Sequence, residues 1–307
     1  MWSGISIVCF ASSYAITLAL EISRLFFRSK IRHLTLLGFL TAGLLAHSIY
    51  LVTQAHRGLE LRGAPLSSWY HWCLIGAWCV AVVYLVFSLS RPGAQAGIFV
   101  LPLILGLLGV ATMLPKDQFF PAERATEYWG MAHGIALLAG TVAACLGFVT
   151  GIMYLVQSYR LKHKWTARPG FRLPSLEWLQ TANERSLVFS SLILASGLLA
   201  GIVLNLIKHS QQAQPLPWSD PVVCISVALL VWLVLVLIFN ALYRPARYGR
   251  KVAYLTTVSF FFLLMVLGFV LFSPTRHATG TAWIGPAELT PMTQCGTTRF
   301  SLPGRRS

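Results

Sequence analysis

Long apolar runs separated by short polar connections make up most of this 307-residue chain. Each run is close to the roughly 20 residues that an α-helix needs to cross the hydrocarbon of a bilayer. The runs lack the alternation of apolar and polar positions that the strands of a membrane barrel show. The pattern therefore predicts an all-α, polytopic membrane bundle of about eight transmembrane helices. The predicted spans are residues 5–27, 33–53, 69–89, 96–114, 129–157, 185–207, 221–243 and 251–273.

Composition supports the same class of protein. Hydrophobic residues make up 56% of the chain and charged residues 11%, with a mean hydropathy of +0.68. Soluble domains carry about 25% charged residues, so this chain has too few charges to cover a soluble globule. The net charge of +15 would suggest a nucleic-acid partner in a soluble protein. In a membrane protein its distribution between loops matters more, and we expect no nucleic-acid partner.

The basic residues predict the orientation, because cytoplasmic loops carry an excess of Lys and Arg. Alternate connections hold 14 of them on one side and 6 on the other, which predicts that both termini lie outside the cytoplasm (N-out/C-out) in the cell inner (cytoplasmic) membrane. The 14 are Arg24, Arg28, Lys30, Arg32, Arg91, Arg160, Lys162, Lys164, Arg168, Arg172, Arg244, Arg247, Arg250 and Lys251. The 6 are Arg57, Arg62, Lys116, Arg124, Lys208 and Arg276.

The chain is expected to form one membrane domain over residues 1–274. Residues 275–307 are rich in Thr, Gly, Pro and Ser, which predicts a largely disordered extracytoplasmic tail. Residues 173–179 suggest a short interfacial helix before the sixth span. Two pairs of glycines four residues apart, Gly147 with Gly151 and Gly197 with Gly201, indicate close helix packing.

Six of the eight histidines fall on the predicted outer side, and imidazole is a common ligand of metals and haem iron. Trp129 and His133 lie one turn apart where the fifth span begins, so both would face the same ligand. His47 lies within the second span, where an ionisable residue usually faces the bundle interior and serves a function. His133 and Trp129 also have an ordinary interpretation as interfacial residues.

Other candidates lie in the outer connections. Trp218 and Asp220 occupy a proline-rich loop, where Asp220 also fits the N-cap of the seventh helix because Pro221 follows it. His277 follows the last span, and Arg276 beside it could pair with a carboxylate such as a haem propionate.

The order of these elements resembles the cytochrome c assembly proteins of the CcsA/ResC type, and especially their short HemX-like branch. The likeness covers most of residues 33–280. It rests on the following elements: His47, Trp129 to His133, Gly151 to Leu155, Leu173 to Glu177, Trp218 to Pro221, Gly249 to Ala253 and His277 to Gly280. Of the family's tryptophan-rich loop, only Trp218 and Asp220 are present.

The resemblance implies that His133 and His277 ligate the iron of haem b, and that His47 belongs to a second haem position within the membrane. It implies haem delivery to apocytochrome c at the outer face together with a partner assembly subunit. The chain could then form part of a haem lyase complex. One alternative is a HemX-like accessory protein that influences haem synthesis without catalysis. Another is a small-molecule transporter, which the lack of paired broken helices disfavours.

Overall fold

A computed structural model gives the fold of the chain. It describes residues 6–26, 30–62, 68–115, 127–164, 171–210, 217–242 and 250–272. The predicted tail at 275–307 lies outside the described residues, as do His277 and Arg276.

Helices are the only regular secondary structure in these ranges, so the predicted all-α class is confirmed. They are α1 (Ile7–Ser23), α2 (Lys30–Arg62), α3 (Trp69–Ser90), α4 (Gly97–Met113), α5 (Glu127–Lys162), α6 (Leu176–Ser210), α7 (Pro221–Leu242) and α8 (Arg250–Phe272). Six of them are long and apolar enough to cross a membrane, whereas α1 and α4 are shorter apolar helices of 17 residues. The chain is a multi-pass helical membrane protein.

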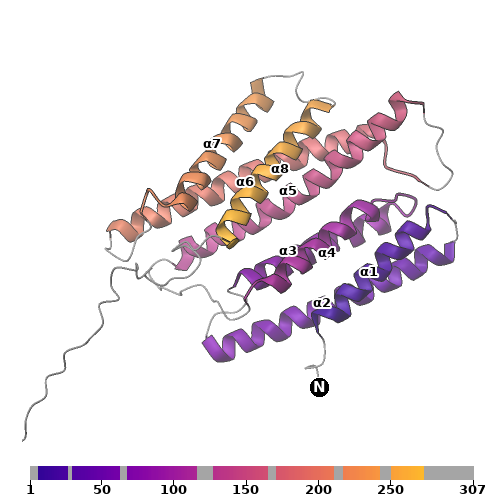
Figure 1. The fold of residues 1–307 in the computed structure, drawn as a ribbon, viewed down its shortest axis with the longest axis horizontal. Coiled ribbons are helices and arrows are strands. Elements are labelled where there is room, and N and C mark those ends of the chain that lie inside the picture. The colour runs from indigo at the N-terminus through magenta and orange to yellow at the C-terminus, as the bar shows by residue number, and fades with distance from the viewer. Residues whose placement is uncertain are drawn as a thin grey trace, which may run out of the picture.

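The helices form two groups of four (Figure 1). Helices α1 to α4 pack together around one apolar core, and α5 to α8 pack around a second. The two groups meet where α3 and α4 contact α5, whose residues Val149, Met153 and Tyr154 belong to the first core. Successive helices run in opposite directions, so all connections that follow odd-numbered helices lie at one end of the bundle (Figure 1).

That end, which we call the basic end, holds most of the described basic residues. They include Arg24, Arg32, Arg91, Arg160, Lys162, Lys164, Arg172, Arg250 and Lys251. We call the other end the opposite end. The helical alternation therefore agrees with the division of charges from which the orientation was predicted.

Several helices extend beyond the predicted spans. Hydropathy locates only the apolar part of a helix, and polar residues continue the same backbone pattern into the interface. Helix α2 runs through Gln54, His56 and Glu60, and α5 continues to Lys162. The prediction of a separate interfacial helix at 173–179 is wrong, because residues 176–210 form one continuous helix. Ser175 directly precedes this helix, and its hydroxyl oxygen accepts the backbone N–H of Trp178 at 3.4 Å.

The two glycine pairs lie where α5 packs against its neighbours, as predicted. An added Cβ at Gly147 would meet Ser186 of α6 and Thr256 of α8 at 3.2 and 3.1 Å, and one at Gly197 would meet Ala136 and Leu137 of α5 at 3.1 Å. Residues without side chains let the backbones of membrane helices approach closely. The pairs are therefore packing positions, although Gly197 and Gly201 also shape the site described below.

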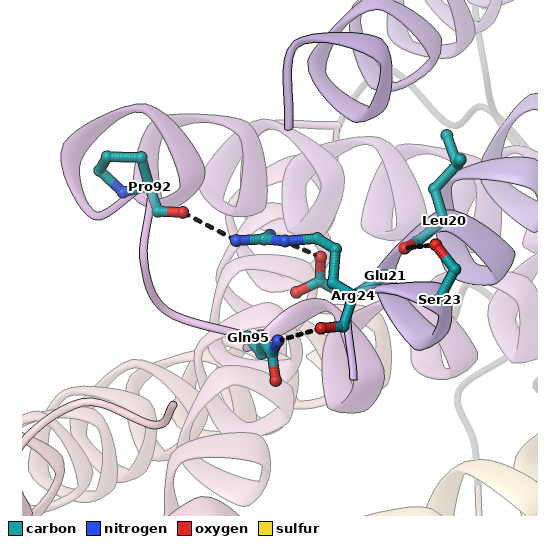
Figure 2. Close-up of polar contacts among 6 residues, drawn as sticks. All are labelled: Leu20, Glu21, Ser23, Arg24, Pro92 and Gln95. Carbon is teal, nitrogen blue, oxygen red and sulfur yellow. Dashed lines mark hydrogen bonds and ion pairs between the residues drawn. The ribbon is translucent and has the colours of Figure 1, made fainter. Parts of the chain in front are cut away.

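A polar network joins α1 to the segment before α4 at the basic end (Figure 2). Arg24 forms an ion pair with Glu21, with Nη1 and Oε2 2.8 Å apart, and its Nη2 donates to the carbonyl of Pro92 at 2.9 Å. Gln95 donates to the carbonyl of Arg24 at 3.4 Å. Glu21 is fully buried, so this network holds an ionisable carboxyl group inside the first group of helices.

Candidate functional site

His133 lies two turns into α5 at the opposite end of the bundle, against the glycine pair of α6. Its Nδ1 is 2.7 Å from the carbonyl oxygen of Gly197. A carbonyl can only accept a hydrogen bond, so Nδ1 carries the proton and donates it. In the neutral ring the lone pair is then on Nε2. The described part of the chain offers Nε2 no hydrogen-bond partner.

Gly201 provides the space that this ring occupies. A Cβ added there would stand 2.7 Å from Cε1 and 2.8 Å from Nδ1 of His133, closer than real contacts allow. Gly197 thus supplies the acceptor and Gly201 supplies the room, one helical turn apart. The small-residue pair both brings α5 and α6 together and fixes the orientation of one imidazole.

This arrangement is suited to a metal ligand. Ligating histidines commonly donate one ring nitrogen to a backbone carbonyl, which fixes the ring and leaves the other nitrogen for the metal. His133 is half-buried, and Trp129 one turn earlier is 45% exposed, so an apolar surface adjoins the imidazole. The chemistry of these residues fits a histidine that would hold a metal such as haem iron beside an apolar surface.

His47 has a different environment. It is fully buried, as expected for a residue facing the bundle interior, and its ring stacks on Phe10 with centroids 4.3 Å apart and planes 5° apart. Tyr14 places its hydroxyl 3.3 Å from Nδ1, and Nε2 is a buried nitrogen without a hydrogen-bond partner. The zero exposure means that no water-sized space adjoins Nε2. In this arrangement the surroundings of His47 do not fit a haem.

The cluster around His47 continues toward the opposite end. Tyr50 also packs on Phe10 and its hydroxyl is 2.6 Å from that of Tyr70. His71, next to Tyr70, places Nδ1 2.6 Å from the hydroxyl of Ser68, the N-cap residue of α3. These polar atoms bond to one another inside the first group of helices, which is typical of a structural network.

Trp218 contacts a histidine that the sequence left without a role. The ring of His209, at the end of α6, stacks on Trp218 with centroids 5.5 Å apart and planes 26° apart. Its Nδ1 lies 2.9 Å from the carbonyl of Asn205, so Nδ1 donates there as it does in His133. Trp218 is 46% exposed. The stacking holds a second carbonyl-backed imidazole beside an exposed indole.

Asp220 caps α7 as predicted. Its Oδ1 accepts the backbone N–H of Val222 at 2.8 Å, and Pro221 is the first helical residue. This contact accounts for Asp220 as a helix cap. A role in ligand binding stays a prediction.

The structure brings together only part of the predicted site. His133 and Trp129 share the start of α5, and Trp218 and Asp220 share the turn before α7, but His277 and Arg276 lie outside the described residues. No group of three or more His, Cys, Asp or Glu side chains suited to a metal ion is found in the described ranges. Iron held by two histidines needs no such group.

Two features of this region were missed by the sequence: the carbonyl of Gly197 as the partner of His133, and the stacking of His209 on Trp218. The signal for the first was present in the glycine pair, but the partner depends on how α5 and α6 are aligned. Comparisons of the chain with protein-family models and with curated proteins find no match to either.

Proposed function

We propose that this protein binds haem at the opposite end of its helical bundle, on the outer face of the membrane, and holds or delivers it for attachment to apocytochrome c. The observation that carries the proposal is the orientation of His133. Its Nδ1 proton is engaged by the carbonyl of Gly197, so Nε2 is the nitrogen presented to a ligand. The sequence resemblance to cytochrome c assembly proteins supports the same chemistry.

In this proposal His133 and His277 would hold the haem iron, and Trp129 and Trp218 would supply apolar surfaces. Arg276 would pair with a propionate, since guanidinium and carboxylate form strong charge-assisted bonds. Bound haem would supply vinyl groups for attachment to cysteine thiols. The protein positions and protects that group, and a partner subunit is expected to bring the apocytochrome. His47 is not included, because its closed environment does not fit a haem.

The test is an absorption spectrum of the purified protein in mild detergent after haem is supplied. Wild type is expected to show a Soret band, and His133→Ala to lose most of it. His277→Ala is expected to weaken and shift the band because one axial nitrogen is lost. His56→Ala is the matched control, since His56 is an exposed histidine in the last two turns of α2 at the same end, and it should leave the band unchanged.

Wild type without a Soret band contradicts haem binding. A band that neither His133→Ala nor His277→Ala changes contradicts the ligand assignment. Staining of covalently bound haem in cells that lack the protein then tests delivery. Loss of c-type cytochromes supports it, whereas normal c-type cytochromes with altered total haem would favour the accessory role in haem synthesis.

A further inference from the structure

An open groove of about 710 Å³ lies along α6 near the basic end. The proposed haem site involves none of the residues that line it. It is lined by Thr181, Glu184, Arg185, Ser186, Val188, Phe189 and Leu192. At 1.5 Å per residue, Arg185 lies roughly 18 to 24 Å along the helix from the glycines that contact His133. The groove is therefore a separate feature.

The lining changes character along the helix. Four polar side chains occupy residues 181–186, toward the basic end, and three apolar ones occupy residues 188–192, toward the middle of the bundle. Phe189 and Leu192 are 59% and 54% exposed. This change from a polar to an apolar surface along the helix matches the layers of one membrane leaflet, where a headgroup lies above an acyl chain.

The polar part of the groove carries one positive and one negative side chain, and these two do not form an ion pair with each other. Arg185 is exposed and Glu184 half-exposed, and neither forms an ion pair or side-chain hydrogen bond with any other described residue. The groove thus offers one free guanidinium, one free carboxylate and the hydroxyls of Ser186 and Thr181, of which Thr181 already donates to the carbonyl of Glu177 and can only accept a further bond. An occupant that satisfies both charges carries an anion and a hydrogen-bonding cation close together.

We propose that this groove binds a phospholipid with an ethanolamine headgroup, one leaflet away from the haem site. The phosphate pairs with Arg185, the primary ammonium donates to Glu184, and an acyl chain lies on Phe189 and Leu192. An anionic lipid such as phosphatidylglycerol carries the phosphate but no cation to pair with Glu184. A choline headgroup carries no N–H to donate to that carboxylate.

The experiment is native mass spectrometry of delipidated protein with dioleoyl phosphatidylethanolamine, phosphatidylcholine or phosphatidylglycerol added at equal concentrations. Wild type is expected to retain the ethanolamine lipid several-fold better than the other two. Arg185→Gln should lower its retention about tenfold, and Arg185→Lys should recover most of it. Glu184→Gln should abolish the preference for ethanolamine over choline. Lys164→Gln and Glu177→Gln are controls that change charge at the same end outside the groove, and both should behave as wild type.

Equal retention of all three lipids by wild type overturns the proposal, since lipid would then coat the surface without a site. Equal losses for Lys164→Gln and Arg185→Gln overturn it as well, because general charge would be the cause. A preference for phosphatidylglycerol that Glu184→Gln leaves unchanged assigns the groove to anionic lipid instead. Helical circular dichroism and elution volume identify any variant that fails to fold, and the remaining variant at the other position then decides.

Discussion

The two groups of four helices surround a histidine with opposite environments. In the first group, His47 is enclosed by Phe10 and Tyr14 with no exposed surface. In the second, His133 is half-buried and one of its nitrogens is fixed by the carbonyl of Gly197. Both lie in apolar helices, so hydropathy and position alone give them equal standing as ligands.

The difference lies in what packs against each ring. Aromatic side chains fill the space around His47, whereas two glycines leave space around His133. An orientating hydrogen bond combined with an accessible second nitrogen is what a ligand requires, and burial on all sides opposes it. The first group is therefore the closed, structural half, and the second carries the candidate site.

The largest stability effect is expected in the closed half, from Arg24→Ala. Removing the guanidinium leaves the Glu21 carboxylate buried without its counter-charge, which typically costs about 3–5 kcal/mol. The free energy of unfolding, measured by reversible SDS titration in mixed micelles, should fall by that amount. Replacing both residues together with Leu should restore most of the loss. A loss below about 1 kcal/mol for Arg24→Ala would mean that the carboxylate is neutral or solvated.

Next in size is Gly201→Ala, which tests the open half. The added Cβ would stand 2.7 Å from the His133 ring, and overpacking of this kind costs about 1–3 kcal/mol. We expect this loss of stability together with a reduced Soret band. Gly268→Ala is the control, because an added Cβ there meets no atom within 4 Å, and it should be neutral or slightly stabilising. Equal effects at the two glycines would refute the fit between Gly201 and His133.

The enclosed histidine is tested by His47→Phe combined with Tyr14→Phe. The pair removes the unpartnered Nε2 and its hydroxyl neighbour together, and burying fewer polar atoms should stabilise the protein by about 1 kcal/mol. His47→Phe alone should gain less, because it leaves the Tyr14 hydroxyl without its partner. Haem absorbance should not change. A lost Soret band would assign His47 to haem binding and remove the contrast with His133.

The smallest effect is expected from Asp220→Ala at the turn before α7. Loss of an N-cap acceptor costs about 0.5–1 kcal/mol, and SDS titration should detect it. Ser219→Ala, at the exposed neighbouring position, should have no measurable effect. If Asp220→Ala leaves stability unchanged but lowers haem absorbance, Asp220 acts on the ligand and not on the helix.

The sequence predicted those features that depend on short stretches of chain. Continuous apolar runs placed all eight described helices, and Asp220 before Pro221 gave the cap of α7. Each of these needs only the geometry of a single helix or turn.

Features that depend on the alignment of two helices could not be predicted. The contact of His133 with Gly197 joins residues 64 positions apart, and the stacking of Phe10 on His47 joins α1 to α2. Hydropathy fixes neither the rotation nor the vertical offset of such pairs. The prediction also left out the polar ends of α2, α5 and α6, because their charged residues lie beyond the apolar stretch that hydropathy detects.

Helix length itself has a consequence for the surrounding lipid. Helices α1 and α4 have 17 residues each and are about 26 Å long, whereas α5 and α6, with 36 and 35, exceed about 50 Å. The hydrocarbon of a typical bilayer is about 30 Å thick. Helices α1 and α4 are therefore slightly too short for it and α5 and α6 much too long, so the bilayer is expected to thin beside the short pair while the long pair tilts or projects into water. The protein is expected to be sensitive to acyl-chain length, with its two flanks favouring lipids of different thickness.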